Sequence, residues 1–196
     1  MQVICIGEAL IDKIISKSDS NFKDFLGGAP ANVVCALRKL NVPASFIGCV
    51  GDDDFGKEFI KLFQQLKINI DFLQIAKESS TRIVKVTRDD SGDRSFSGFE
   101  VTKSNDFADE MLDKLLIIKD IKNLKKQFLK TKYIVTGTNL LAFSKSAESL
   151  NFILDFAKNF RIKVIIDVNW REIFWDHANI DRDIRFRKVK NLVNHI

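Results

Sequence analysis

The chain contains few of the residues that are typical of particular classes of protein. Its 196 residues include two prolines, one tyrosine, two histidines and three cysteines. Cys5, Cys35 and Cys49 lie in apolar segments without the close spacing of zinc ligands or redox pairs, so we expect reduced thiols. No apolar run approaches the roughly 20 residues that span a bilayer, and no secretory leader is apparent. These absences favour a protein of the cytoplasm with no membrane partner.

The excess of positive charge is small. Lys and Arg number 31 against 26 Asp and Glu, which gives a formal charge of +5. The most basic stretches, residues 119–132 and 182–190, combine cations with apolar residues at helical spacing, which indicates solvated faces of amphipathic helices. We therefore expect no nucleic-acid partner, although the charge would suit a small anionic ligand.

Strand-like and helix-like segments alternate along most of the chain. Short apolar runs predict buried strands, and apolar residues three and four apart predict amphipathic helices. A turn-rich segment at 89–93 separates two extended segments and predicts a β-hairpin. This order predicts an α/β fold with a doubly wound parallel sheet, in which ligands bind beyond the carboxyl ends of the strands. The expected strands are 3–7, 9–16, 44–50, 81–88, 94–99, 133–138 and 164–168, and the expected helices are 31–40, 55–66, one or two within 105–128, and 146–160.

Two glycine-containing motifs precede the first two helices. In GGAPAN, at 27–32, the paired glycines let the backbone approach a ligand, and Pro30 suits the first position of a helix. In GDDDFG, at 51–56, three acids could hold a divalent cation, but helix capping explains them better because a helix start has free N–H groups. Asn41 is expected to close the first helix in a left-handed conformation. The first motif therefore predicts a small-molecule site, and no metal ligands are assigned.

Five motifs follow one another along nearly the whole chain. They are GEALID at 7–12, GGAPAN at 27–32, GCVGDD at 48–53, GDRSF at 92–96 and DVNWR at 167–171. In this order they resemble the ribokinase/PfkB family of ATP-dependent sugar kinases, and most closely its fructokinase branch. The resemblance implies that 1–196 form an incomplete ribokinase-like α/β domain. It also implies a small β-sheet lid, built from about 9–16 and 81–99, over the sugar site.

The resemblance assigns roles to residues in these motifs. A carboxylate and an amide suit a polyol because one accepts hydroxyl hydrogen bonds and the other both donates and accepts. Taken singly, an acid in a strand or an asparagine in a first helical turn is more often structural, and only the joint placement favours a site. The implied cofactors are ATP and Mg²⁺. The implied sugar-binding residues are Asp12, Gly27, Gly28, Asn32, Arg94 and Arg171, and Asn169 is implied to approach the phosphates of ATP.

The acid at position 100 bears on the substrate. Relatives often have an arginine near this position, where some use it against the carboxylate of an acid sugar. Glu100 would repel such a group, so we expect a neutral hexose such as fructose. The alternative substrates are 2-keto-3-deoxygluconate or a nucleoside.

The 196 residues contain no Gly-Ala-Gly-Asp sequence. In the family that segment supplies the catalytic base and an anion hole, so we assign no catalytic residue and expect the isolated chain to be inactive. One hypothesis is therefore the N-terminal portion of a fructokinase-like enzyme, and the alternative is a non-catalytic sugar-binding or interaction remnant. A homodimer through the lid, or association with a missing C-terminal half, is expected because sheet edges and helix faces are left uncovered.

Overall fold

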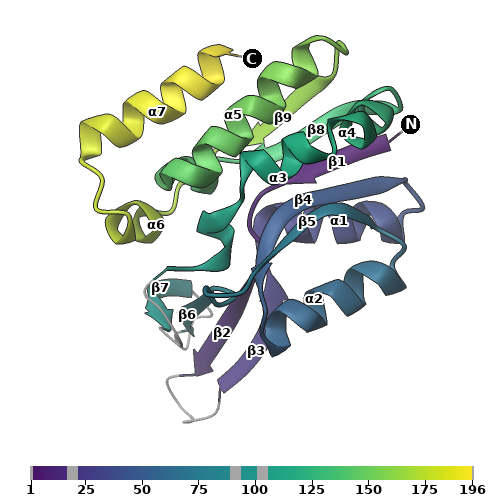
Figure 1. Ribbon diagram of the computed structural model, residues 1–196. Helices are drawn as coiled ribbons and strands as arrows, with labels where there is room; N and C mark the ends of the chain where they lie inside the picture. Colours follow the sequence, from purple (N-terminus) through teal and green to yellow (C-terminus); the bar gives the residue numbers. More distant parts are fainter. Residues whose placement is uncertain (1, 17–21, 89–93, 101–105, 196) are drawn as a thin grey trace.

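Two sheets organise the protein (Figure 1). The computed structural model describes residues 2–16, 22–88, 94–100 and 106–195. The larger sheet has five strands in the order β5-β4-β1-β8-β9, and every neighbouring pair is parallel. Its strands are β1 (Gln2–Ile6), β4 (Ala44–Gly51), β5 (Asn69–Ala76), β8 (Thr131–Gly137) and β9 (Lys163–Asp167).

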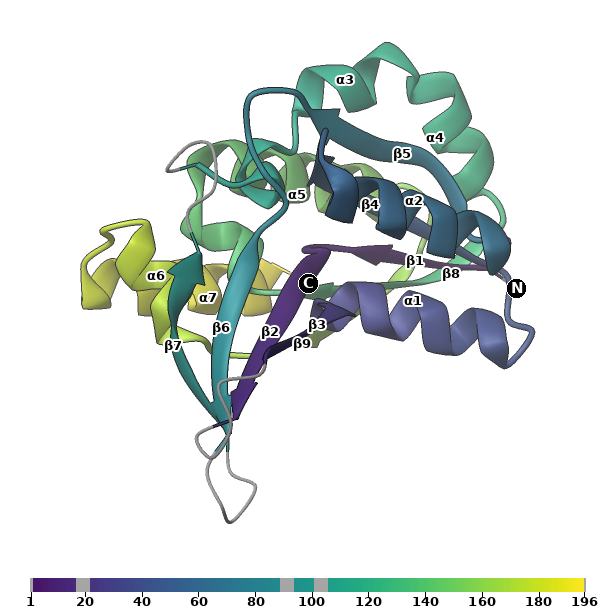
Figure 2. The same cartoon turned by 90° about the horizontal axis from the view of Figure 1, so that it is seen from below.

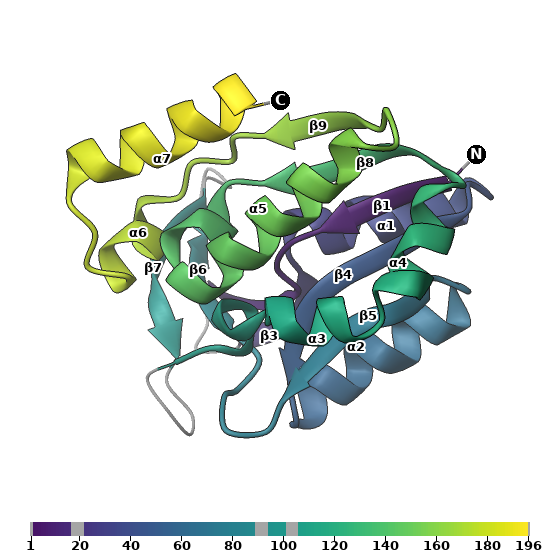
Figure 3. The same ribbon diagram turned by 45° about the horizontal axis from the view of Figure 1, so that its top comes forward.

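Helices cover both faces of the larger sheet. On one face lie α1 (Ala29–Lys39) and α2 (Asp54–Gln65), and on the other lie α3, α4 and α5 (Figure 3). The interior strand β4 is buried along its whole length, as expected for a parallel strand between two helical layers. This arrangement confirms the predicted doubly wound α/β fold. The other helices are α3 (Lys114–Lys119), α4 (Ile121–Phe128), α5 (Ser144–Lys158), α6 (Glu172–His177) and α7 (Arg182–His195), with short 3-10 helices η1 (Ala108–Met111) and η2 (Asn139–Ala142).

The smaller sheet extends away from the larger one (Figure 2). Its strand order is β3-β2-β6-β7, with β2 and β6 parallel and the two outer pairs antiparallel. The predicted hairpin corresponds to β6 and β7, and its turn at 89–93 lies outside the described residues. The strands are β2 (Leu10–Ser16), β3 (Phe22–Gly27), β6 (Ile83–Arg88) and β7 (Arg94–Glu100).

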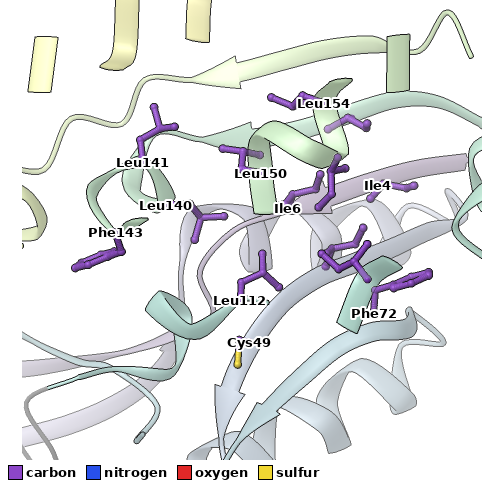
Figure 4. Packing of buried hydrophobic residues seen from close by; sticks show 14 of the residues in the cluster. Ile4, Ile6, Cys49, Phe72, Leu112, Leu140, Leu141, Phe143, Leu150 and Leu154 are labelled. Atoms are coloured by element: carbon purple, nitrogen blue, oxygen red, sulfur yellow. The ribbon is translucent and has the colours of Figure 1, made fainter. Parts of the chain in front are cut away.

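The apolar core is divided between the two faces of the larger sheet. Figure 4 shows the cluster in which Ile4 and Ile6 of β1 pack with Leu150 and Leu154 of α5. A second cluster joins the opposite face to α1 and α2. Each fully buried side chain of this size contributes about 1.5–3 kcal/mol, so the two layers hold the strand ends in fixed positions. Among the described residues, none of the helices is long and apolar enough to cross a bilayer.

Asp53 joins the larger sheet to the smaller one. Its Oδ1 accepts a hydrogen bond from the Gly56 N–H at 2.8 Å, so it caps α2 as predicted. The same carboxylate accepts hydrogen bonds from the Thr81 N–H at 2.7 Å and the Thr81 hydroxyl at 2.9 Å. Because Thr81 lies just before β6, this acid fixes the entry into the smaller sheet. At the end of α1, Asn41 has a φ of 60°, which confirms the predicted left-handed cap.

Candidate active site

A cavity of about 180 Å³ lies where the carboxyl ends of the large-sheet strands face the smaller sheet. Five of the predicted site residues line it together, although they come from segments far apart in the sequence. Its volume is below the roughly 300–1,000 Å³ of pockets for drug-sized ligands, which suits a small ligand. The lining residues are Glu8, Leu10, Asp12, Ile14, Gly28, Ala29, Asn32, Val84, Val86, Phe96, Asn139, Asn169, Arg171 and Phe174.

The cavity lies at the point where the strand order reverses. The chain leaves β1 for β4 on one side and later returns to β8 on the other. In open parallel sheets the loops diverge at such a point and leave a crevice beyond the strands. Glu8 follows β1 and Asn139 follows β8, so both line this crevice.

Asp12 reaches the cavity from the smaller sheet. It lies on β2 between Leu10 and Ile14, which share its face of the strand and also line the cavity. Gly27 on β3 is the close neighbour of its carboxylate, because a Cβ built at Gly27 would lie 2.5 Å from Asp12 Oδ2. Glycine at this position therefore leaves room for the carboxylate, whereas the predicted contact of Gly27 with a sugar stays a prediction, because Gly27 does not line the cavity.

Gly28 and Asn32 present the start of α1 to the cavity. Gly28 has a φ of 96°, and a Cβ there would lie 2.4 Å from the backbone oxygen of Glu8. Both features demand glycine. The Gly28 carbonyl accepts the first helical hydrogen bond from the Asn32 N–H at 2.8 Å, and the exposed Asn32 side chain lies at the mouth of the cavity. Gly28 is the N-cap residue and has no side chain with which to cap the helix.

Asn169 and Arg171 line the cavity from the segment after β9. The Asn169 N–H donates to Asp167 Oδ1 at 3.0 Å, and its φ of 36° turns the chain toward the smaller sheet. The Arg171 guanidinium lies 4.9 Å from the centre of the Phe96 ring on β7. Contacts between a cation and an aromatic face are attractive, so Arg171 links the two sheets across the cavity.

Two residues of the smaller sheet fall outside this arrangement. Arg94 begins β7, but its side chain lies outside the part of the chain that the structure describes. Glu100 does not line the cavity, and its carboxylate accepts a hydrogen bond from Lys13 Nζ at 2.6 Å. The argument that the charge of Glu100 repels an acid sugar therefore loses its geometric basis, because the lysine compensates that charge.

Glu8 and Asn139 were not predicted as site residues. Their side chains are 1% and 3% exposed, and Asn139 Nδ2 donates to Glu8 Oε1 at 3.1 Å. Burial raises the pKa of Glu8 to about 7, and hydrogen bonds from backbone N–H groups and Asn139 offset this effect only in part. The signal available in the sequence was their position just after predicted strands, which is also the position of Asn169.

Arg82 forms a buried charged cluster beneath the cavity wall. Its side chain is 0% exposed, and it donates to Asp109 at 2.9 Å and to Glu110 Oε1 at 2.7 Å. Four phenylalanine rings surround the guanidinium, including Phe174 of the cavity at 4.7 Å. The backbone carbonyl of Arg82 accepts from the Ile11 N–H at 2.8 Å, next to Asp12. Arg82 thus anchors the strand that carries the predicted sugar-binding acid.

Metal ligation is a separate question. Among the described residues, no group of three or more His, Cys, Asp or Glu side chains is placed to hold a metal ion. The acidic segment 52–54 fits the capping interpretation better than metal binding, because the Asp53 carboxylate accepts hydrogen bonds from Gly56 and Thr81.

Comparison with known proteins identifies the family. The model of the pfkB family carbohydrate kinases matches residues 1–183. A 5-dehydro-2-deoxygluconokinase of Clostridium perfringens is 32% identical over 185 residues, which cover 90% of this chain and 52% of that protein. A fructokinase of Vibrio alginolyticus is 35% identical over 125 residues, 64% of this chain and 38% of that protein.

Solved structures agree with the sequence comparisons. The crystal structure of fructokinase from Xylella fastidiosa has a TM-score of 0.78 at 26% identity, over 95% of this chain and 56% of that one. A sugar kinase of Pyrococcus horikoshii in complex with ATP has a TM-score of 0.76 at 25% identity, over 96% and 58%. The chain spans about half the length of the relatives it matches. Residues of four of the five motifs line one cavity in a ribokinase-like fold, and the family model covers most of the sequence, so this chain belongs to the pfkB family of carbohydrate kinases.

Proposed function

We propose that this chain carries the sugar site of an ATP-dependent kinase that phosphorylates a hydroxyl of a neutral hexose, as a fructokinase does. The observation that supports it most is the convergence of Asp12, Asn32 and Arg171 on one small cavity. Family members use ATP as the phosphate donor. An ATP-using enzyme is expected to work in the cytoplasm.

The chemistry of the cavity suits a monosaccharide. The Asp12 carboxylate can accept hydrogen bonds from two neighbouring hydroxyls, and the Asn32 amide can both donate and accept. Apolar side chains such as Val84 and Phe174 offer surface for the C–H groups of a sugar ring. Gly28 lines the cavity and has no side chain, so a ligand can approach the backbone there.

Phosphoryl transfer depends on positioning the two substrates and on stabilising charge. In this proposal Asp12 and Asn32 orient the acceptor hydroxyl, Arg94 and Arg171 complete the sugar site, and Asn169 lies toward the phosphates of ATP. Mg²⁺ would screen those phosphates in the complete enzyme. No step is assigned to the metal here.

An acid sugar is the second candidate substrate. Arg171 lines the cavity and could pair with a carboxylate, whereas Glu100 is paired with Lys13. The Clostridium perfringens relative is named as a kinase of an acid sugar. A nucleoside is a less suitable occupant of about 180 Å³.

Calorimetric titration tests the sugar site. We expect the chain to bind D-fructose, and Asp12→Asn to lower the affinity at least about tenfold, because the amide cannot accept two hydroxyl hydrogen bonds as strongly. Asp24→Asn on the neighbouring strand β3 is the matched control and should bind normally, since Asp24 is exposed and does not line the cavity. Tighter binding of 2-keto-3-deoxygluconate than of fructose would favour the acid-sugar candidate.

An ATP-coupled assay tests the expected inactivity. The chain contains no Gly-Ala-Gly-Asp sequence, so we expect no turnover with fructose, ATP and Mg²⁺. Turnover at the rate of a complete kinase would contradict this part of the proposal. Binding without turnover would also be the behaviour of a sugar-binding remnant, and restoring turnover by adding the C-terminal half of a relative would favour the split-enzyme form.

Self-association through the smaller sheet is part of the same proposal. Phe22 and Phe25 on the edge strand β3 are 58% and 48% exposed, an apolar surface that a second copy could cover. Sedimentation equilibrium should then give a dimer, and Phe25→Ser should weaken it. A monomer at all concentrations would contradict this element.

A further inference from the structure

The last residue of α6 is tied to a buried acid outside the cavity. His177 Nε2 lies 3.1 Å from Glu110 Oε1, within hydrogen-bonding distance. Glu110 belongs to η1, and the same oxygen accepts a hydrogen bond from Arg82 Nη2 at 2.7 Å. Neither His177 nor Glu110 lines the cavity, and the proposed sugar contacts use neither of them. The contact therefore joins α6 to the buried charged cluster around Arg82.

Aromatic side chains give the His177 ring a defined position. Its centre lies 5.3 Å from the ring centres of Phe99 and Phe107 and 6.1 Å from that of Phe143. The Arg82 guanidinium lies over the same three rings, so the histidine and the arginine share one aromatic environment. A hydrogen bond is stronger in such apolar surroundings than in water, so the link from His177 to the acid can hold α6 although its side chain is 26% exposed.

The helix that ends at His177 also carries part of the cavity wall. Phe174 lines the cavity and packs against Phe99 of β7, with the ring centres 5.3 Å apart. Arg171 is the N-cap residue of α6, and its carbonyl accepts a hydrogen bond from the Phe174 N–H at 3.1 Å. Because α6 has six residues and so short a helix is marginal by itself, its position depends on contacts with neighbouring elements. His177 supplies such a contact at the end that does not line the cavity.

We propose that His177 is a positioning residue for the sugar site, which holds α6 through Glu110 so that Arg171 and Phe174 keep their places in the cavity wall. This inference rests on the proposed function and adds a residue that acts through others without touching the ligand. Without the link, α6 can occupy other positions. The apparent affinity for a sugar then falls with the fraction of molecules in which the cavity wall is complete.

Two substitutions of His177 separate its hydrogen bond from its packing. His177→Phe keeps an aromatic ring but has no donor, whereas His177→Gln keeps an N–H donor but has no ring. Calorimetric titrations are made at pH 8, because burial raises the pKa of Glu110 to about 7 and its carboxyl is then mostly ionised.

We expect His177→Phe to bind D-fructose at least about fivefold more weakly than the wild-type chain, and His177→Gln to bind it within about twofold of wild type. A role in packing alone predicts the opposite order. Glu172→Gln on the same helix is the matched control, because Glu172 is exposed and does not line the cavity. The control should bind fructose like the wild-type chain.

Tryptophan fluorescence reports the position of α6 in the absence of sugar. The two tryptophans of the chain are Trp170 and Trp175, whose rings stack with their centres 5.4 Å apart. Trp175 lies in α6 and is fully buried, so loosening of the helix should admit water and shift the emission to longer wavelength. We expect this shift in His177→Phe, and spectra like that of the wild-type chain in His177→Gln and in the control.

The outcomes separate this inference from the proposed function. Normal fructose affinity of His177→Phe, weak binding by His177→Gln, or unshifted emission of His177→Phe would each overturn the positioning role. If the wild-type chain binds no sugar, the proposed function fails, and the emission spectra alone decide whether His177 holds α6. Should circular dichroism show that His177→Phe does not fold, His177→Leu replaces it with the same expected results, because leucine also lacks a donor.

Discussion

The buried carboxyl of Glu8 should make the folded chain less stable as the pH rises. Burial raises its pKa from the ordinary value of 4.5 to about 7. The folded state therefore holds a proton that the unfolded state has released, so the contribution of Glu8 is complete below about pH 4.5 and is lost as the pH rises through about 7. At 1.36 kcal/mol for each pH unit, the loss amounts to about 3 kcal/mol, because the group is fully buried and little screened by solvent.

Urea unfolding of the wild-type chain and Glu8→Gln at pH 5, 6, 7 and 8 measures this loss. Burial also raises the pKa of Glu110 to about 7, but Glu110 is present in both proteins, so the difference between their free energies of unfolding isolates Glu8. Because glutamine does not titrate, we expect the stability of the variant relative to wild type to grow by about 2.5 kcal/mol between pH 5 and pH 8, since part of the loss already occurs below pH 5. Parallel pH profiles, within about 0.5 kcal/mol, would refute the reasoning.

Three further substitutions test the supports of the site. Gly27→Ala should displace the Asp12 carboxylate, because the new Cβ would lie 2.5 Å from Asp12 Oδ2. Calorimetry should then show fructose binding weakened at least about tenfold. Normal affinity would show that the position of the carboxylate is unimportant. Asp53→Ala should lower the free energy of unfolding, measured in urea, by about 2–4 kcal/mol, because the cap of α2 and both hydrogen bonds from Thr81 are lost. A loss below about 0.5 kcal/mol would contradict this prediction. Arg82→Met should lower the free energy of unfolding by about 3–5 kcal/mol at pH 8 and by less at pH 5, where the uncompensated acids can take up protons. An equal loss at both pH values would argue against a charge effect.

Local sequence patterns predict most of the fold. The helices α1, α2 and α5 were predictable because each buries a periodic apolar face, and the strands β1, β4 and β8 were predictable because each contains a short apolar run. The cap at Asp53 was predictable for the same local reason, since capping involves residues three apart. Two edge strands were missed. β3 is exposed over most of its length and β5 has a mixed burial pattern, so neither shows the apolar run of a central strand.

The site was predictable only in part. Asp12, Gly28, Asn32, Asn169 and Arg171 stand in motifs, and the structure brings them to one cavity. The roles of Glu8 and Arg82 depend instead on partners distant in sequence. Arg82 meets acids 27 and 28 residues later, and Glu8 meets an asparagine 131 residues later. No local pattern indicates such pairs, because they form only when the sheet assembles.

A crystal structure of the chain grown with D-fructose tests the central claim most directly. The account predicts sugar density in the cavity, with hydroxyls within hydrogen-bonding distance of Asp12 and Asn32. Fructose bound elsewhere on the protein, or an empty cavity at saturating sugar, would contradict it.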